Sequence, residues 1–437
     1  MAMDLIVRGA NLPDGRVGVD IGVQDGRIVA VEPALKAEAG QEIDATDRLV
    51  SPPFIDAHFH MDATLARALT DALPRPDQSG LLFEGIYLWD ELKRQLTPKA
   101  VADRAMTYCD MAIAQGIQAI RSHVDVCDER LTGVEALLDV KRRVAPYIDL
   151  QLIAFPQMGY YRYPNAQDHL RRALDMGVEV VGGIPHFERS MADGTESVTE
   201  LLEIAAARGL LVDMHCDETD DPMSRHIETL ARETHRLGLQ GRVTASHLTS
   251  MHVMDNYYVS KLIPLIAESE IGVTPNPLTN IAAWGHNNGS YPKWRGMTRV
   301  PELREAGITI AFGQDCMMDP WYVYGSADML EVAHMGSHVA AMFKEDEVRA
   351  CFDAITVGPA RMMHLEGYGL EPGCHADMVV LQAADPLEAI RLRATRLAVI
   401  RRGEVVARTP ATVTELSVPG RPNSVAPTYK PTDSGNG

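Results

Sequence analysis

Residues 51–62 read SPPFIDAHFHMD, and this stretch gives the first indication of the fold. A run of strand-forming apolar residues ends in two histidines separated by one residue, His58 and His60. Imidazole is a common metal ligand. Residues i and i+2 of an extended chain point to the same side, so both rings are able to hold one ion. One His-x-His pair in a chain with 15 histidines is weak evidence alone, so the rest of the sequence decides.

The same pattern of an apolar run ending in polar side chains occurs eight times along the chain. The runs cover 52–60, 117–125, 150–157, 178–186, 210–218, 242–247, 271–276 and 308–315. They end, in that order, in His58 and His60, His123 and Asp125, Gln157, His186, His215 and Glu218, His247, Asn276, and Asp315. Helix-length amphipathic segments separate the runs, which is typical of repeated βα units. The sequence therefore predicts a (β/α)8 TIM-type barrel, whose active site lies at the carboxyl ends of the strands.

Two of the intervening helices carry clear boundary signals. Thr97 is a predicted N-cap with Pro98 at the first helical position, and Gly116 ends that helix. A second helix is predicted to begin near Thr195 and to end at Gly209.

Both ends of the chain differ from the middle and read as short strands and tight turns. Asp25-Gly26 is a hairpin signal, and the same β-rich texture returns from residue 366. We expect a small β-sandwich domain formed by residues 1–52 and 366–418, a catalytic barrel over 53–365, and a C-terminal arm or disordered tail over 419–437. The tail is rich in Pro, Ser, Asn and Gly.

The composition of the chain limits the classes of molecule that the protein is expected to bind. The 437 residues are 46% apolar and 23% charged, typical of a soluble globular protein, and no apolar run is long enough to span a membrane. A net charge of −19 argues against nucleic acid and permits a small neutral or cationic substrate. The start of the chain has no secretory pattern, and six scattered cysteines suit a reducing compartment, so a cytoplasmic location is expected.

Four of the strand-end residues form a candidate metal site. His58 and His60 from the first strand, His215 from the fifth and Asp315 from the eighth supply three imidazoles and one carboxylate, a suitable set for a divalent ion. The first and eighth strands are neighbours in a closed barrel, and the fifth faces them across it. The stretch 180–188, VVGGIPHFE, has no lysine to bridge two ions, so one metal is predicted.

These motifs, H-x-H, HCDE at 215–218, SH at 246–247 and FGQDCMMDPW at 312–321, resemble the amidohydrolase superfamily. Within it, the chain is similar to the bacterial cytosine deaminases along nearly its whole length. Further segments share the resemblance, among them QSGLLFEGI, HCDETDDPMSRHIETL, YPKWRGMTRV and DPWYVYGSADMLEVAHMGSH.

The resemblance implies a role for each candidate residue. The metal, Fe(II) or Zn(II), lowers the pKa of a bound water to near neutrality. Glu218 matches the general acid/base, His247 the histidine that orients that water, and Asp315 a ligand that also accepts its proton. Gln157 matches the side chain that holds the amide edge of a pyrimidine, because a carboxamide both donates and accepts. Trp321 is expected to wall the ring. The resemblance also implies a homo-oligomer.

The sequence departs from the cytosine deaminases at two places. Cys316 follows the metal-ligand aspartate, where those enzymes have a second aspartate. A smaller, apolar residue there opens space for an added methyl group, so 5-methylcytosine is a hypothesis, with retained cytosine preference as the alternative. The loop that contains Trp284 and His286 also differs, and it is compatible with a bicyclic ring such as isoguanine or a pterin.

The sequence thus predicts a metal-dependent deaminase of a small nucleobase-like ring, cytosine or 5-methylcytosine or both. A related barrel that removes an alkylamine from a triazine is an alternative. A non-catalytic scaffold is disfavoured because all the metal and acid/base residues are present. The sequence does not identify the metal and does not distinguish a salvage role from a catabolic one. It also assigns no role to His123 or His186.

Overall fold

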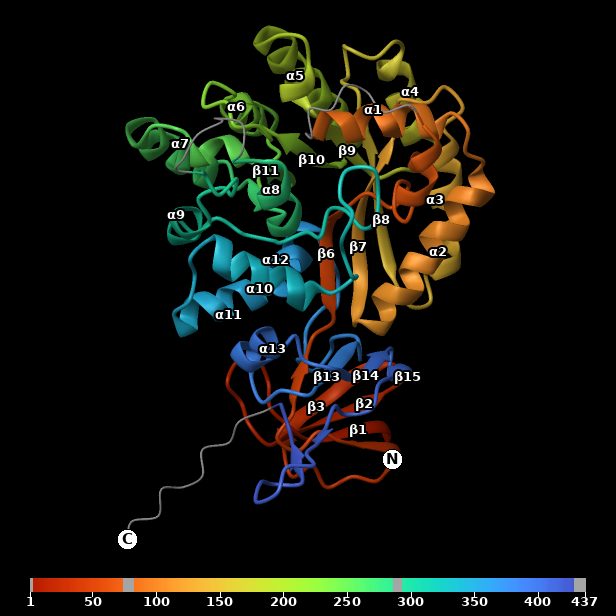
Figure 1. The fold of residues 1–437 in the computed structure, drawn as a ribbon, viewed down its shortest axis with the longest axis vertical. Coiled ribbons are helices and arrows are strands. Elements are labelled where there is room, and N and C mark those ends of the chain that lie inside the picture. The colour runs from red at the N-terminus through yellow and green to blue at the C-terminus, as the bar shows by residue number, and fades with distance from the viewer. Residues whose placement is uncertain (1–2, 74–81, 286–292, 428–437) are drawn as a thin grey trace. The chain divides into compact units, whose positions relative to one another are not determined.

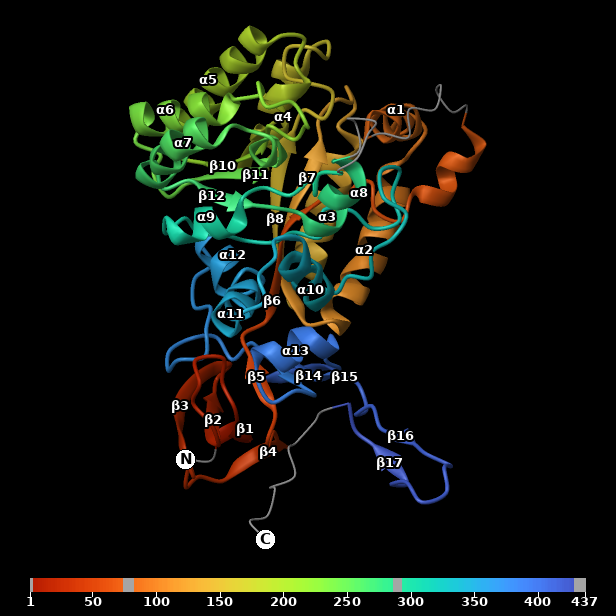
Figure 2. The ribbon, with the colours of Figure 1, turned by 60° about the vertical axis from the view of Figure 1, so that its left-hand side comes forward.

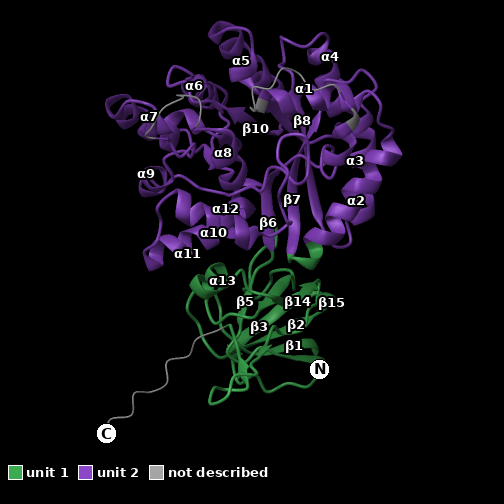
Figure 3. Ribbon diagram, in the orientation of Figure 1, with its two compact units in different colours: residues 1–53, 113–116, 366–437 green, residues 54–112, 117–365 purple. Residues whose placement is uncertain are grey.

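The computed structural model describes residues 3–73, 82–285 and 293–427 of the chain, and Figures 1 and 2 show its ribbon in two views. It divides into two compact units, which Figure 3 colours separately. Unit 1 comprises residues 1–53, 113–116 and 366–437, and unit 2 comprises 54–112 and 117–365. His286 and residues 428–437 of the expected tail lie outside the described residues.

Unit 2 is built on seven parallel strands that follow the order of the chain around the sheet. They are β6 (Phe54–Phe59), β7 (Ile117–Asp125), β8 (Asp149–Phe155), β9 (Val180–Gly183), β10 (Leu211–Cys216), β11 (Val243–His247) and β12 (Gly272–Thr274). Every residue of β6 and β7 is buried, as expected for parallel strands covered on both faces. The seven strands correspond to the first seven apolar runs of the sequence.

The eighth run closes the ring through backbone bridges rather than as a regular strand. On one side, Val273 N donates to Thr309 O at 2.9 Å; on the other, Asp315 N donates to His58 O at 2.7 Å. Between these bridges Gln314 N donates to the carboxylate of Asp56 at 3.0 Å instead of to a neighbouring strand, which interrupts the ladder. The TIM-type barrel is confirmed, and its last strand is irregular where it meets the first.

Helices cover the outside of the barrel strands (Figure 1). In α3 (Thr132–Val144) the buried residues include Val134, Leu137, Val140 and Val144, one apolar stripe, and basic residues fill its last turn. The other helices of unit 2 are α1 (Leu82–Lys93), α2 (Pro98–Ala114), α4 (Ala166–Met176), α5 (Met191–Arg208), α6 (His226–Leu237), α7 (Asn256–Glu268), α8 (Pro277–Ala283), α9 (Val300–Glu305), α10 (Met329–Val339), α11 (Glu345–Asp353) and α12 (Val357–Met362).

The predicted start of α2 and the predicted end of α5 at its C-cap Gly209 are confirmed, and the predicted start of α5 is wrong. Helix α2 begins at Pro98, and the Thr97 hydroxyl accepts from Ala100 N at 3.2 Å. Helix α5 begins at Met191 rather than near Thr195, because the Ser190 side chain caps it by accepting from Asp193 N.

Unit 1 is a β-sandwich to which both ends of the chain contribute, as expected. One sheet has the order β3 (Arg27–Pro33), β2 (Val19–Gln24), β1 (Met3–Ala10), β4 (Ala39–Asp44). The other has the order β15 (Glu404–Arg408), β14 (Arg396–Arg401), β13 (Met378–Leu381), β5 (Leu49–Ser51). Leu5, Ile21, Val50, Val380 and Ile400 belong to the core between them. Unit 1 also holds α13 (Pro386–Leu392) and the hairpin of β16 (Thr414–Glu415) and β17 (Ser424–Val425).

Among the described residues, none of the helices is both long enough and apolar enough to cross a lipid bilayer.

Candidate active site and metal centre

Three strand ends bring the four predicted metal ligands of unit 2 into one cluster. His60 Nε2 lies 3.1 Å from His215 Nε2, and one oxygen of Asp315 lies 3.4 Å from Nε2 of both His58 and His60. All four side chains are buried. The backbone bridge between Asp315 and His58 fixes the aspartate against β6. Ligands from different strands, 100 to 257 positions apart in sequence, thus meet as the barrel closes.

The donor set of this cluster fits a divalent metal. In the described part of the chain, neither His58 Nε2 nor His215 Nδ1 has a hydrogen-bond partner, although both are buried. Burial, reinforced by neighbouring imidazoles, lowers the pKa of His215 well below its ordinary value, so the ring is neutral, as a ligand must be. A buried nitrogen without a hydrogen-bond partner, such as His58 Nε2 beside Asp315, is expected where an ion completes the site.

His123 of β7, to which the sequence assigned no role, lies in the same cluster. Its ring centroid lies 4.2 Å from that of His58 and 4.4 Å from that of His215. The ring is fully buried, and neither nitrogen has a hydrogen-bond partner among the described residues. Its ligand atoms lie within 4.8 Å of those of His58, His60 and His215. His123 and these other histidines come from different strands, so only the folded barrel shows that they lie close together.

A pocket of about 300 Å³, its open mouth included, lies over the cluster. Its lining contains all three predicted substrate contacts together with the predicted acid/base residues: His60, Gln157, Ile184, His215, Glu218, His247, Thr279, Asp315, Cys316 and Trp321. Burial, with the nearby charge of Asp315, raises the pKa of the Cys316 thiol well above its usual range. Cys316 is therefore a neutral, apolar part of the wall rather than a nucleophile.

Glu218 is held in place from two sides. Trp284 Nε1 donates to Glu218 Oε1 at 3.0 Å, and both side chains are buried. The backbone N–H of Glu218 donates to His186 Nδ1 at 3.4 Å. Burial, together with the charge of Asp315, raises the pKa of Glu218 well above its usual value, against the opposing bond from Trp284. A carboxyl group in this state is able to carry a proton at neutral pH.

These contacts give Trp284 and His186 roles that the sequence did not assign. Burial lowers the pKa of His186 to about 4, so its ring stays neutral and is able to accept a hydrogen bond. Trp284 directs its N–H at Glu218 and is absent from the described lining of the pocket, so it acts behind the carboxylate. No local sequence pattern signals either contact, because both join segments far apart in the chain.

His247 is oriented by two asparagines and by its backbone. Asn280 Nδ2 lies 2.9 Å from His247 Nδ1, and Asn276 Nδ2 lies 3.2 Å from Nε2. His247 has φ of +69°, a left-handed conformation that is uncommon for residues other than glycine and frequent at functional sites. Burial lowers the pKa of His247 well below its ordinary value, so the ring is neutral.

The wall formed by Trp321 depends on close packing and on one carboxylate. Asp319 Oδ1 accepts from Trp321 N at 3.0 Å and from Tyr322 N at 2.9 Å, which fixes the loop. Gly85 of α1 faces the indole: a Cβ there would lie 2.5 Å from Trp321 Cδ1. A residue without a side chain is therefore required at that point of α1. The Trp321 ring lies 5.6 Å from that of His60.

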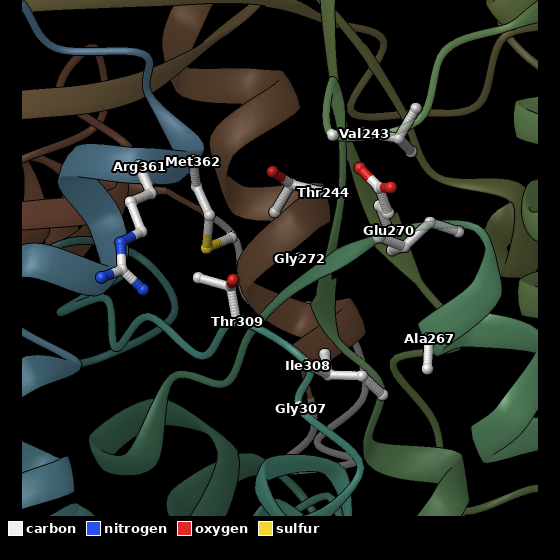
Figure 4. Close-up of a pocket in the computed structure, with 12 residues that line it drawn as sticks. Val243, Thr244, Ala267, Glu270, Gly272, Gly307, Ile308, Thr309, Arg361 and Met362 are labelled. Atoms are coloured by element: carbon white, nitrogen blue, oxygen red, sulfur yellow. The ribbon is translucent and has the colours of Figure 1, made fainter.

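A second cavity, about 700 Å³ with its opening, lies at the opposite, amino-terminal ends of β11 and β12 (Figure 4). Its lining includes Thr244, Glu270, Thr309, Arg361 and Met362, and no histidine or cysteine is among the described residues that line it. Glu270 and Arg361 are both exposed. The larger volume therefore lacks the donors of the histidine cluster, and the smaller pocket is the candidate active site.

The sequence matches the Amidohydrolase family over residues 41–407. A solved structure of 5-methylcytosine deaminase from Klebsiella pneumoniae, liganded with 5-fluorocytosine, superposes with a TM-score of 0.89 at 40% identity, covering 93% of this chain and 98% of that one. N-isopropylammelide isopropyl amidohydrolase of Pseudomonas sp. (strain ADP) is 29% identical over 93% of this chain and 97% of its own length. Pterin deaminase of Rhizobium rhizogenes is 28% identical, over 90% and 89%.

Proposed function

Because the chain belongs to the amidohydrolase family and is a hydrolase of carbon–nitrogen bonds, we propose that it deaminates a cytosine-like ring, 5-methylcytosine or cytosine, with one divalent metal. The observation that carries the proposal is the pocket in which Gln157, Glu218 and Cys316 surround the histidine–aspartate cluster. The 40% identity to 5-methylcytosine deaminase over nearly the whole chain supports the same substrate class.

His58, His60, His215 and Asp315 would hold the metal, Fe(II) or Zn(II). When bound, a divalent ion supplies a water-derived nucleophile at neutral pH. With the metal bound, Asp315 would accept the proton of the attacking water, and His247 would orient that water. Deamination adds water at the amino-bearing carbon and releases ammonia, so the remaining protons must reach the ring nitrogen and then the leaving amine. Glu218 transfers them, because its raised pKa lets it carry a proton at neutral pH.

Substrate recognition is assigned to the other side of the pocket. Gln157 follows β8 and is buried, and its carboxamide donates to and accepts from the amide edge of a pyrimidine. Trp321 covers one face of the ring. Among the alternative substrates, a bicyclic ring is no longer favoured by the position of Trp284, because the indole N–H of Trp284 donates to Glu218. The alternative reaction, removal of an alkylamine from a triazine, is supported by the sequence similarity to the Pseudomonas enzyme.

The proposal is tested by ammonia release from metal-reconstituted protein given cytosine, 5-methylcytosine, isoguanine, pterin and N-isopropylammelide in parallel. Rapid release from 5-methylcytosine or cytosine, and slow release from the bicyclic rings, is the expected result. Turnover of a bicyclic ring alone contradicts the substrate class and leaves the hydrolase assignment intact. Isopropylamine from N-isopropylammelide, without ammonia from the pyrimidines, favours the triazine alternative.

Cys316 is proposed to select the methylated pyrimidine. Burying one methyl group contributes about 0.8 kcal/mol, equivalent to about 4-fold in kcat/KM. Cys316→Asp would place a charged, larger group against that methyl, so the ratio of kcat/KM for 5-methylcytosine to that for cytosine is expected to fall about 4-fold or more. Cys316→Ser, which keeps the size, is the matched control and should preserve the ratio. Equal ratios in the wild type and Cys316→Asp would show that the residue does not select the substrate.

Trp284→Phe removes the donor to Glu218 and keeps an aromatic side chain. A hydrogen bond to a charged group contributes about 1.5–3 kcal/mol, so kcat is expected to fall about 10-fold or more with little change in KM. Trp294→Phe, an exposed tryptophan nearby in the chain, is the control. Steady-state kinetics measure the effect. A rise in KM at constant kcat would instead assign Trp284 to substrate binding.

A further inference from the structure

A buried chain of hydrogen bonds leads from the metal cluster into the barrel interior. His58 Nδ1 lies 2.9 Å from Ser246 Oγ, and Ser246 Oγ donates to Asp213 Oδ1 at 2.6 Å. The other oxygen of Asp213 accepts from Arg121 Nη1 at 3.3 Å. All four side chains are almost fully buried. They come from β6, β11, β10 and β7, four strands of the same barrel.

The proton count along this chain fixes the state of His58. A serine hydroxyl has one hydrogen, and Ser246 gives it to a carboxylate that faces a guanidinium and is therefore an acceptor. Ser246 Oγ has then only lone pairs to offer His58, so the hydrogen between them belongs to His58 Nδ1. The neutral ring consequently leaves Nε2 unprotonated. Nε2 is the buried atom without a hydrogen-bond partner in the described structure, 3.4 Å from Asp315.

We propose that Ser246 is a positioning residue for the metal site, which fixes His58 as the Nδ1–H tautomer with Nε2 directed at the ion. Asp213 orients the hydroxyl, and Arg121 holds Asp213. The inference rests on the proposed metal site and is independent of the substrate. Metal-bound histidines generally donate their second ring N–H to an acceptor that sets the tautomer and the ring orientation. Here the acceptor is the Ser246 hydroxyl, which itself donates to the Asp213 carboxylate.

Further hydrogen bonds anchor Arg121 at the end of this series of contacts. Its guanidinium also donates to Gln151 Oε1 at 2.6 Å, Thr244 Oγ1 at 3.1 Å and Met362 O at 2.9 Å. These bonds fix the position of the group that faces Asp213. His123 Nε2 lies 3.9 Å from Asp213 Oδ1, too far for a hydrogen bond, so it does not compete with Ser246.

The test measures metal affinity instead of turnover. Ser246→Ala and wild-type protein are stripped of metal, and the Kd for Zn(II) is obtained by competition with a chromophoric chelator. Loss of an outer contact of this kind weakens metal binding by about 10- to 100-fold, and that is the expected change. Ser197→Ala is the matched control, since Ser197 is equally buried and its hydroxyl donates only to the local backbone at Gly194 O in the described contacts. Ser246→Thr, which retains the hydroxyl, is expected to recover most of the affinity.

Two results separate this inference from the proposed function. A wild-type protein that binds no Zn(II) contradicts the metal site itself. Tight binding by the wild type, with an equal Kd for Ser246→Ala, overturns only the role of Ser246. If Ser246→Ala does not fold, the tautomer is read directly in the metal-free wild type from 15N-labelled histidine spectra, with the His58 signal assigned by its loss in His58→Asn. A hydrogen on Nδ1 supports the proposal, and a hydrogen on Nε2 overturns it.

Discussion

Glu218→Gln is expected to lower kcat by about 1,000-fold while the bound metal remains at the wild-type level. General acid–base catalysis contributes about 100- to 10,000-fold, and Glu218 is the one described carboxylate of the pocket lining other than Asp315. The amide keeps the size of the side chain and can still contact Trp284, so the loss reports proton transfer rather than a collapsed pocket. Steady-state ammonia release and metal analysis of the same sample measure the two quantities.

Glu228→Gln provides the control for this change. Glu228 lies ten residues further along the chain, exposed in the first turn of α6, and its substitution should leave kcat within about 2-fold because exposed surface changes are usually small. If Glu218→Gln retained more than a tenth of the wild-type kcat, Glu218 would not be the proton carrier. If Glu218→Gln also lost its metal, metal binding would depend on Glu218 more strongly than the geometry indicates.

Asp315→Ala is expected to remove both metal and activity, with kcat reduced by 10,000-fold or more. Removing Asp315 takes away a proposed ligand and the proposed proton acceptor at once, and it leaves a polar gap beside His58 and His60. Metal content after dialysis and ammonia release are the measurements. Asp103→Asn, at an exposed pair with Lys99 on α2, should change neither.

An excess of metal provides the second arm of that experiment. If Asp315 acts only as a ligand, saturating Zn(II) should restore much of the activity of Asp315→Ala. If it also accepts the proton, occupancy returns and kcat stays low, which is the expected outcome. Full activity in the absence of bound metal would contradict the account.

The sequence predicted the parts of the site that periodicity and strand ends control. His58 and His60 lie two residues apart at the end of a buried run, and His215 and Asp315 end other runs, so the barrel topology alone brings them to one face. The shared β-rich texture of the two chain ends likewise predicted that they meet in one small sheet domain, and β5 from one end pairs with β13 from the other.

Contacts set by tertiary packing could not be predicted. Trp284 reaches Glu218 across 66 positions, and the loop around it has no hydrophobic period to give its direction. The irregular eighth strand depends on the bond from Gln314 N to the Asp56 side chain, which the alternation of apolar residues does not encode. Helix α5 was placed too late because its cap, Ser190, precedes the amphipathic pattern.

The central claim is that one metal ion per chain supports deamination of a cytosine-like ring. It is tested most directly by adding Zn(II) or Fe(II) in steps to metal-free protein and measuring ammonia release from 5-methylcytosine and cytosine at each step. We expect activity to rise linearly and to saturate at one ion per chain. Saturation at two ions, or no ammonia from either pyrimidine at full occupancy, would contradict it.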